Sequence, residues 1–128
     1  MSNKLPLLAI TMGDPAGIGP EVVLKALQHA DVYARCRPLV LGDRRILERA
    51  APWVGAAELE YELVEDPVGG HYRAGSVTLL DMANAAPGDC PIGQISAEAG
   101  RAAVEYVFRA CDLAMQGAAD AVVTAPAR

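Results

Sequence analysis

The residues best suited to chemistry lie in one glycine-rich turn near the amino terminus, Thr11–Glu21. Three glycines and two prolines separate an apolar segment from an amphipathic one, which is the pattern of a strand, a shaped loop and a helix. Glycine lets backbone N–H groups approach a ligand closely, and a helix beginning near Pro20 favours an anion at its N-terminus. Asp14 would stand at the strand tip, where its carboxylate could accept hydrogen bonds from ligand hydroxyls. The turn therefore predicts a ligand-binding site.

The candidate cofactor-binding or cleft-lining residues in this turn are Gly13, Asp14, Gly17 and Gly19. If they bind a ligand, valine at position 17 or 19 should weaken binding more than folding. The turn matches neither GxGxxG nor GxxxxGK[ST], the patterns that cradle phosphates. A purely structural interpretation is equally consistent with the residues: Asp14-Pro15 opens a turn, and the glycines serve only backbone geometry. The residue pattern alone leaves both interpretations open.

Thr124 is a further candidate for lining the same cleft. It ends an apolar run, Asp120–Thr124, that predicts a buried strand. Because parallel strands end at the same edge of a sheet, Thr124 should lie at the same edge as Thr11. Open α/β folds bind their ligands at this edge.

The histidines and cysteines carry weaker signals. His29 lies near a predicted helix end and His71 in a glycine-flanked loop, and we interpret both as ordinary cap or loop residues. Cys36, Cys90 and Cys111 are widely spaced and form no CxxC pair, so they predict reduced cytosolic thiols, mostly packing residues, rather than a disulfide framework or a zinc site. We predict no metal ligands in this chain.

Strand and helix patterns alternate along the chain. The predicted strands are Leu5–Thr11, Pro38–Gly42, Leu59–Val64, Val77–Asp81 and Asp120–Thr124. The third alternates apolar with acidic residues, so it should be half-exposed and near a sheet edge. The predicted helices are Pro20–Ala30, a short helix from the N-cap Asp43 to Ala50, and a long helix over Ala97–Met115 with Ser96 as its cap.

The long helix carries its polar side chains on one narrow stripe. This stripe consists of Glu98, Arg101, Glu105, Arg109, Asp112 and Gln116. Since nearly every other residue of the helix is apolar or small, we expect it to be buried over most of its circumference.

These elements predict an α/β fold with αβα layers around a largely parallel sheet. The chain has 128 residues, enough for one such layer structure. It stops directly after a strand whose end should carry a loop and a helix, so we expect it to be the front part of a longer protein. The net charge of −5 argues against nucleic acid or an anionic membrane as the partner. No secretion signal or membrane-spanning run is visible, which favours a cytoplasmic protein.

Three blocks resemble one enzyme family in order and spacing. They are the run ITMGDPAGIGPE (Ile10–Glu21), the block SAEAGRAAVEY (Ser96–Tyr106) and the block DAVVTAP (Asp120–Pro126). Together they resemble the amino-terminal part of 4-hydroxythreonine-4-phosphate dehydrogenase, the PdxA family of vitamin B6 biosynthesis. The first block is also similar to the shorter GDGIGPE of isocitrate and isopropylmalate dehydrogenases, which share the fold of that family.

The resemblance implies a homodimeric, two-domain dehydrogenase that uses NAD or NADP and a divalent metal such as zinc, magnesium or cobalt. Its substrate would be 4-phosphohydroxy-L-threonine, oxidised and then decarboxylated on the route to pyridoxal 5'-phosphate. Residues 1–128 would be the amino-terminal α/β portion of that enzyme. The metal-binding histidines of the family and its Gly-His-Thr-Glu stretch fall beyond Arg128, so this portion alone should be inactive, and its catalytic residues are unknown.

Two alternatives remain open. The same motif occurs in relatives that act on 4-phospho-D-threonate, on 4-phospho-erythronate or on aromatic cis-dihydrodiols. An alternative of another class is a non-catalytic module that binds a nucleotide or a phosphate. The second alternative is favoured if these 128 residues are the whole gene product, because the metal histidines would then be missing.

Overall fold

One parallel sheet organises the chain. A computed structural model describes residues 4–126, and within them five strands lie in the order β3-β4-β2-β1-β5. The strands are β1 (Leu7–Thr11), β2 (Arg37–Gly42), β3 (Glu60–Leu63), β4 (Ser76–Asp81) and β5 (Ala121–Thr124). Every neighbouring pair is parallel, as the alternation of strand and helix patterns predicted.

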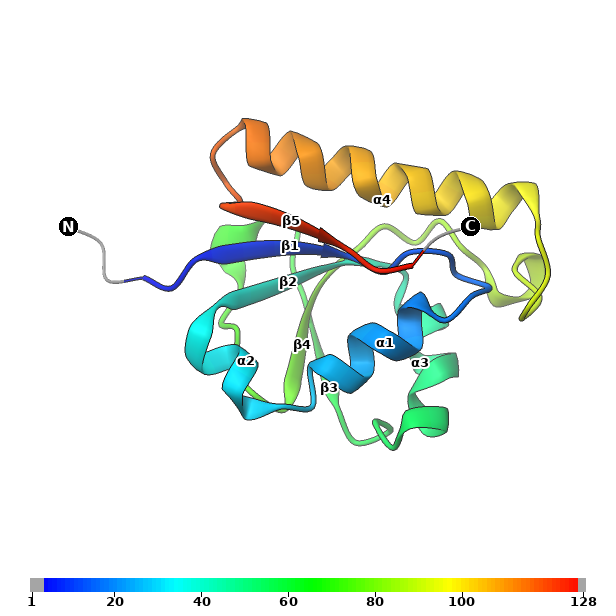
Figure 1. Cartoon of the computed structure of the whole chain (residues 1–128), viewed down its shortest axis with the longest axis horizontal. Helices are drawn as coiled ribbons and strands as arrows, with labels where there is room; N and C mark the ends of the chain where they lie inside the picture. Colours follow the sequence, from blue (N-terminus) through cyan, green and yellow to red (C-terminus); the bar gives the residue numbers. More distant parts are fainter. Residues whose placement is uncertain (1–3, 127–128) are drawn as a thin grey trace.

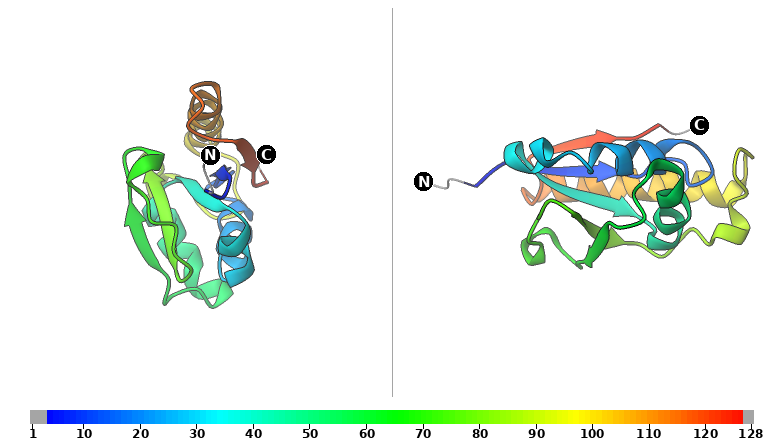
Figure 2. Two further views of the ribbon diagram at one scale, coloured as in Figure 1. Left: turned by 90° about the vertical axis from the view of Figure 1, so that its left-hand side faces the viewer. Right: turned by 90° about the horizontal axis from the view of Figure 1, so that it is seen from below.

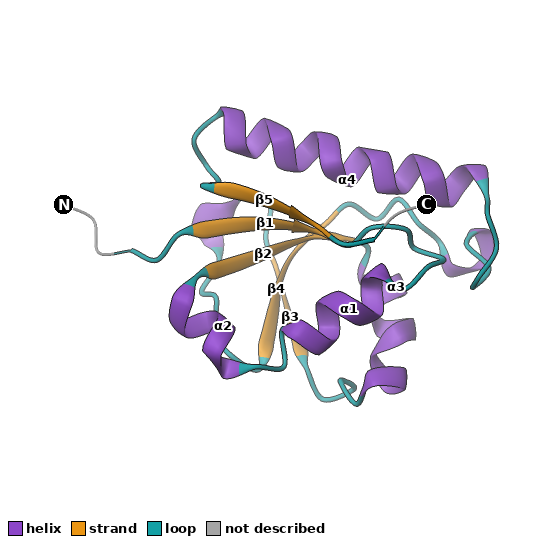
Figure 3. Ribbon diagram, viewed as in Figure 1, coloured by secondary structure: helices purple, strands orange, loops and turns teal. Residues whose placement is uncertain are grey.

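Helices cover the two faces of the sheet unequally. The helix α4 (Ala97–Met115) lies over β1, β5 and β2 on one face, whereas the other three helices lie on the opposite face (Figures 1 and 3). Those three are α1 (Gly19–Ala26), α2 (Ala30–Arg35) and α3 (Arg44–Ala50). Right-handed crossovers between parallel strands explain the division. The chain steps toward the β3 edge of the sheet from β1 to β2 and toward the β5 edge from β4 to β5, so the connecting helices lie on opposite faces. The left view of Figure 2 shows the same separation from another direction.

The predicted caps are present. The side chain of Asp43 accepts a hydrogen bond from the backbone N–H of Arg45 at 2.9 Å, which starts α3. The hydroxyl of Ser96 accepts one from the N–H of Ala99 at 3.1 Å, which starts α4. Each cap satisfies an N–H that has no partner within its own helix.

The helix predicted over Pro20–Ala30 ends earlier than expected, and a separate helix that the sequence analysis did not predict follows it. α1 ends at Ala26, and His29 has an extended backbone (φ −88°, ψ 118°) that makes it the N-cap residue of α2. Leu27 is buried while the side-chain amide of Gln28 donates to the carbonyl oxygen of Val54 at 2.9 Å. These tertiary contacts redirect the chain where helix propensity alone would have continued it.

The prediction that α4 is buried over most of its circumference is wrong. Its buried face consists of Ala99, Ala102, Ala103, Tyr106, Ala110 and Leu113. On the opposite side Val104, Phe108 and Met115 are exposed. Within residues 4–126 the sheet covers only one side of the helix, so its apolar outer side has nothing to pack against.

The edge strand β3 is joined to β4 through Glu62. Its carboxylate pairs with the ring Nδ1 of His71 and accepts hydrogen bonds from the His71 backbone N–H (2.8 Å) and the Thr78 hydroxyl (2.9 Å). Burial raises the pKa of Glu62, but these hydrogen bonds outweigh it and lower the pKa from 4.5 to about 2. This explains His71 structurally, because it holds the loop after β3 against the strand.

This pairing predicts a pH dependence. A carboxyl whose pKa is lower in the folded state stabilises the fold above its unfolded pKa and loses that contribution as the pH falls. The free energy of unfolding should therefore decrease between pH 4.5 and about 2, and Glu62→Gln should flatten the decrease. Urea denaturation across this range measures it. Glu60→Gln, on an exposed side chain of the same strand, is the control; equal slopes for the two variants would contradict the assignment.

Candidate functional site

The glycine-rich turn lies at the carboxyl edge of the sheet, between α1 and the ends of three strands. The N–H of Met12 donates to the carbonyl oxygen of Leu41 on β2 at 2.9 Å. The N–H of Asp14 donates to the carbonyl oxygen of Pro126, just past β5, at 3.2 Å. The turn is therefore held on both sides by the strands next to β1, as expected for a binding loop in an open α/β sheet.

Two of the glycines are required by close backbone packing. Gly13 has a positive φ of +79°, and a Cβ atom there would collide with the carbonyl oxygen of Pro126. A Cβ atom on Gly19 would collide with the carbonyl oxygen of Met12. Both glycines are buried. The structure therefore supports the structural interpretation for these two positions, and a substitution at Gly19 should damage folding before it affects any ligand.

Asp14 turns its carboxylate back onto its own loop. The side chain is only 6% exposed, and its Oδ1 accepts a hydrogen bond from the N–H of Ala16 at 2.8 Å. The N–H of Gly17 donates to the Asp14 carbonyl oxygen at 3.0 Å. These bonds form the Asx-type turn that an Asp-Pro pair favours. In this conformation Asp14 shapes the turn, and its role toward ligand hydroxyls stays a prediction.

Gly17, which is half-buried, and Ile18, which is exposed, form the tip of the turn. A Cβ atom on Gly17 would lie 3.3 Å from the Asp14 Cβ, a tight contact with a side chain rather than a collision with backbone. Of the candidate residues in the turn, Gly17 is thus the one best placed to meet a ligand.

Thr124 lies beside Thr11, as predicted. The two residues are partners in the β1–β5 register. Thr11 is fully buried, and its hydroxyl has no hydrogen-bond partner among the described residues, whereas Thr124 is exposed. Thr124 also lines a small groove of about 180 Å³ between α1 and β5, whose other walls are mainly aliphatic.

Arg49 joins the turn to the loop after β4. From α3, its guanidinium donates to the carbonyl oxygen of Pro15 at 3.0 Å and to those of Pro87 and Cys90 at 3.2 and 3.0 Å. The N–H of Gly93 donates to the carbonyl oxygen of Ala16 at 2.7 Å. Four hydrogen bonds thus connect two loops far apart in the sequence, and sequence reasoning missed this connection.

Two aspartate carboxylates near the turn accept hydrogen bonds from backbone N–H groups. Asp43 directly follows β2, and Asp81 is the last residue of β4. Asp43 is fully buried and accepts from the N–H of Ala85 (2.9 Å) as well as from Arg45. Desolvation raises the pKa of Asp43, but these bonds and the Arg45 charge outweigh it and lower the pKa. Asp81 accepts from the N–H groups of Arg44 (3.3 Å) and Ala83 (3.0 Å). The sequence analysis did not single out Asp81. The signal that could have found it is an aspartate at the carboxyl end of each of two neighbouring strands. In the structure Asp81 caps the loops with these hydrogen bonds.

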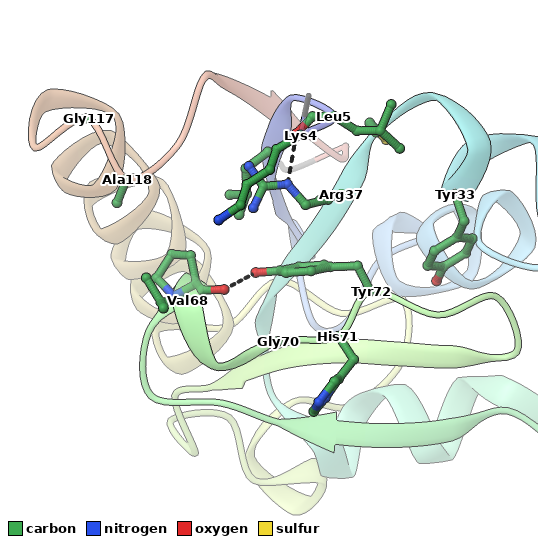
Figure 4. Close-up of a pocket in the computed structure, with 13 residues that line it drawn as sticks. Lys4, Leu5, Tyr33, Arg37, Val68, Gly70, His71, Tyr72, Gly117 and Ala118 are labelled. Atoms are coloured by element: carbon green, nitrogen blue, oxygen red, sulfur yellow. Dashed lines mark hydrogen bonds between the residues drawn. The ribbon is translucent and has the colours of Figure 1, made fainter. Parts of the chain in front are cut away.

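A larger hollow than the groove between α1 and β5 lies at the other end of the sheet, away from the turn. It has a volume of about 540 Å³ and is lined by Lys4, Arg37, Tyr33 and Tyr72, among others (Figure 4). The Arg37 guanidinium lies 5.9 Å from the centre of the Tyr72 ring, and its Nε donates to the Leu5 carbonyl oxygen at 2.8 Å. His71 extends away from this hollow toward Glu62. Leu7 and Arg37 begin β1 and β2, so the hollow is at the amino edge, opposite to the edge where α/β sheets place their ligands.

The carboxyl edge lacks a metal-ligand set among residues 4–126. No group of three or more histidine, cysteine, aspartate or glutamate side chains there could hold a metal ion. The aspartates nearest the turn are already bonded to backbone N–H groups. The described part of the edge can therefore shape and position a ligand, but it does not itself assemble a metal centre. No helix in residues 4–126 is long and apolar enough to cross a membrane.

Comparison with known proteins decides the family. The family model "Pyridoxal phosphate biosynthetic protein PdxA" matches residues 34–128. The chain belongs to the PdxA family. The match begins after the glycine-rich turn, but individual PdxA relatives align over 98% of the chain and so include the turn.

Three PdxA relatives illustrate the similarity. A 4-hydroxythreonine-4-phosphate dehydrogenase from Burkholderia phymatum is 49% identical with a TM-score of 0.92, over 98% of this chain and 38% of its own. The Klebsiella pneumoniae 4-hydroxythreonine-4-phosphate dehydrogenase is 31% identical with a TM-score of 0.88, over 99% of this chain and 38% of its own. The D-threonate 4-phosphate dehydrogenase of Cupriavidus necator is 44% identical over 126 residues, 98% of this chain and 37% of its own. The chain thus spans little more than a third of the length of these relatives.

The packing of the turn predicts unequal costs for its glycines. Gly19→Ala should lower the free energy of unfolding by about 3 kcal/mol or more, because the backbone must move to admit the methyl group. Gly17→Ala should cost about 1 kcal/mol or less, since only the Asp14 side chain must shift. Urea denaturation of both variants measures the difference. Equal costs would show that the close approach at Gly19 does not control the turn.

The Arg49 bridge predicts a coupling between the two loops. Arg49→Met should lower the free energy of unfolding by about 2 kcal/mol, because it removes three charge-assisted hydrogen bonds. It should also speed exchange of the Gly93 amide, which hydrogen exchange with NMR detection resolves. Arg101→Met, on an exposed side chain of α4, is the matched control and should change stability by about 0.5 kcal/mol or less. Unchanged Gly93 exchange in the Arg49 variant would contradict the bridge.

Proposed function

We propose that this chain is the amino-terminal α/β portion of a two-domain, NAD(P)-dependent dehydrogenase of phosphorylated hydroxy acids. The observation that carries the proposal is the 49% identity and 0.92 TM-score to a 4-hydroxythreonine-4-phosphate dehydrogenase over 98% of the chain. That span includes the turn, both loops joined by Arg49, and Thr124. In this proposal the carboxyl edge of the sheet forms one wall of the substrate cleft.

The described residues define what this wall contributes. Gly13 and Gly19 hold the turn against Met12 and Pro126, and Arg49 holds it against the loop after β4. The tip of the turn, with Gly17 half-buried and Ile18 exposed, and the exposed Thr124 are then available to position a ligand. The amino end of α1 adds a partial positive charge beside the tip, which suits an anionic group.

The metal and most of the cofactor site must come from elsewhere. A divalent ion needs several oxygen or nitrogen ligands, and residues 4–126 offer no such group. Four N–H groups of the turn, those of Met12, Asp14, Ala16 and Gly17, are bonded within the protein rather than available to a pyrophosphate. We therefore propose that the metal ligands and the catalytic acid–base groups lie in polypeptide outside this chain. When bound, the metal would polarise the substrate hydroxyl and the nicotinamide would accept hydride.

Two substrates are supported, and they differ at one carbon. The structural relatives are named for 4-hydroxythreonine-4-phosphate, and the Cupriavidus necator relative is named for D-threonate 4-phosphate. Both names describe a four-carbon acid with a hydroxyl at the carbon to be oxidised and a terminal phosphate. The first carries an amine on the carbon next to the carboxylate where the second carries a hydroxyl. Groups facing that carbon therefore decide between the two.

The direct test is a substrate comparison with the natural protein that contains this sequence. NAD or NADP is supplied with each substrate, with zinc, magnesium or cobalt, and the formation of reduced nicotinamide is followed. We expect kcat/KM for one substrate to exceed the other by about a hundredfold or more, because a mispaired polar group in the site is costly. The 128-residue chain alone should give no turnover. No turnover by the natural protein with either substrate would overturn the proposal.

A second test addresses the tip of the turn. Gly17→Val in the natural protein should lower kcat/KM by about tenfold or more while its Tm shifts by only a few degrees. Gly100→Val is the matched control, because Gly100 is exposed and a Cβ atom there meets nothing within 4 Å. If both variants retain full activity, the tip does not contact the ligand.

A further inference from the structure

The hollow at the amino edge of the sheet is cationic, although the chain as a whole is acidic. Its volume of about 540 Å³ falls among those of sites for small organic molecules, about 300–1,000 Å³. Lys4 and Arg37 line it, whereas no aspartate or glutamate is among its described lining residues. Because the chain carries a net charge of −5, this hollow is a local exception. A concave surface with charge of one sign attracts ligands of the opposite sign.

The Arg37 guanidinium is held in place with donors to spare. Its Nε donates to the Leu5 carbonyl oxygen at 2.8 Å, and its central carbon lies 5.9 Å from the centre of the Tyr72 ring. Within residues 4–126 no hydrogen bond or ion pair engages its two Nη groups. Figure 4 shows Arg37 and Lys4 extending into the hollow. A fixed guanidinium with unused N–H donors suits a two-point contact with a carboxylate or a phosphate.

Tyr72 is fixed in an unusual conformation beside Arg37. Its backbone φ is +53°, a left-handed value that tyrosine rarely adopts. Its hydroxyl donates to the carbonyl oxygen of Pro67 at 2.6 Å, and the ring lies so close to Gly70 that a Cβ atom there would collide with it. Such conformations persist only where the surrounding contacts enforce them, and they are frequent at binding sites. The contacts therefore fix both the ring and the guanidinium above it.

The other polar groups of the wall are uncharged at neutral pH. Burial raises the pKa of Tyr33 and of Tyr72 to about 12, and it also raises the pKa of the Cys36 thiol. Glu62 and Asp66 lie outside the lining, and each accepts a hydrogen bond from a backbone N–H of the loop between β3 and β4. The described lining thus contributes no negative charge to offset its cations.

We propose that this hollow binds a small organic anion, whose phosphate or carboxylate group contacts Arg37 and Lys4 and whose carbon skeleton lies against the apolar part of the wall. That part includes Leu5, Pro67, Val68 and Ala118. A hollow of this size holds more than a bare ion, and its aliphatic side chains favour an apolar portion on the ligand. The proposal rests on the hollow alone and does not depend on the proposed function.

The first test compares four probes, by titration calorimetry with the natural protein that contains this sequence. Phenyl phosphate and benzoate combine an anion with an apolar ring, benzyl alcohol lacks the charge, and inorganic phosphate lacks the ring. We expect phenyl phosphate or benzoate to bind about tenfold or more tightly than the last two probes. Tighter binding of phenyl phosphate would assign a phosphate ester, and tighter binding of benzoate a carboxylic acid. If neither binds more tightly than inorganic phosphate and benzyl alcohol, the proposal is wrong.

Hydrogen exchange with mass spectrometry locates the bound probe. The tighter of the two aromatic anions should slow exchange about threefold or more in segments 66–72 and 116–118, which contribute opposite walls of the hollow. Slowing confined to other segments would overturn the proposal, because the probe would then be bound elsewhere.

Variants at Val68 test the charge of the hollow without endangering the fold, because this side chain is 90% exposed. Val68→Glu should weaken binding of the same probe about tenfold or more by repulsion, and Val68→Lys should not weaken it. Ile95→Glu, at an 85% exposed position outside the lining, controls for the added charge and should change the affinity by about twofold or less. Equal affinities of the two glutamate variants would contradict the proposal.

A second pair of variants tests the guanidinium itself. Arg37→Met should weaken binding about tenfold or more, because it removes the charged donors. Arg73→Met makes the same change at an exposed side chain that does not line the hollow, and it should leave the affinity within about twofold. Equal binding by these two variants would also overturn the proposal. If Arg37→Met does not fold, the Val68 variants decide.

Discussion

The close approach of backbone to backbone at Gly13 and Gly19 is the constraint on which the carboxyl edge depends. A methyl group at either position would meet a carbonyl oxygen, that of Pro126 or that of Met12. Because no side chain intervenes, the turn can pack against the chain beyond β5 while its first N–H bonds to β2. The shape of the turn therefore fits the strand order β2-β1-β5. A larger residue would separate them and open the edge that presents Gly17 and Thr124.

Charge at this edge serves mainly to hold the loops in place. Asp14, Asp43 and Asp81 each accept hydrogen bonds from backbone N–H groups, and Arg49 donates to three backbone carbonyls. Such bonds rigidify a loop at low cost because they satisfy groups that would otherwise be buried without partners. The same bonds occupy the carboxylates that could have bound a metal or moved a proton. In the proposed enzyme this portion would thus provide a rigid wall of the cleft.

Much of the fold could be predicted from local patterns. The apolar runs ending at Thr11, Gly42, Asp81 and Thr124 each predicted a strand, and Asp43 and Ser96 predicted the helix starts. Two predictions failed where long-range contacts decide the outcome. Helix propensity could not show that α1 stops at Ala26, since Gln28 contacts Val54 in a distant segment. Composition could not show that α4 is covered on one side only, because that depends on how much polypeptide surrounds it.

The sequence by itself determined the parallel α/β architecture, the position of the glycine-rich turn between a strand and a helix, and the resemblance to the PdxA family. These follow from residue periodicity and from motifs that are contiguous in the chain. Only the tertiary structure decided what each candidate residue does. In the folded chain the Asp14 carboxylate bonds to the backbone of its own loop, and Gly13 and Gly19 allow close packing of backbone on backbone. Arg49 joins two loops through its hydrogen bonds. Such roles depend on atoms brought together from distant parts of the chain, which no local pattern records.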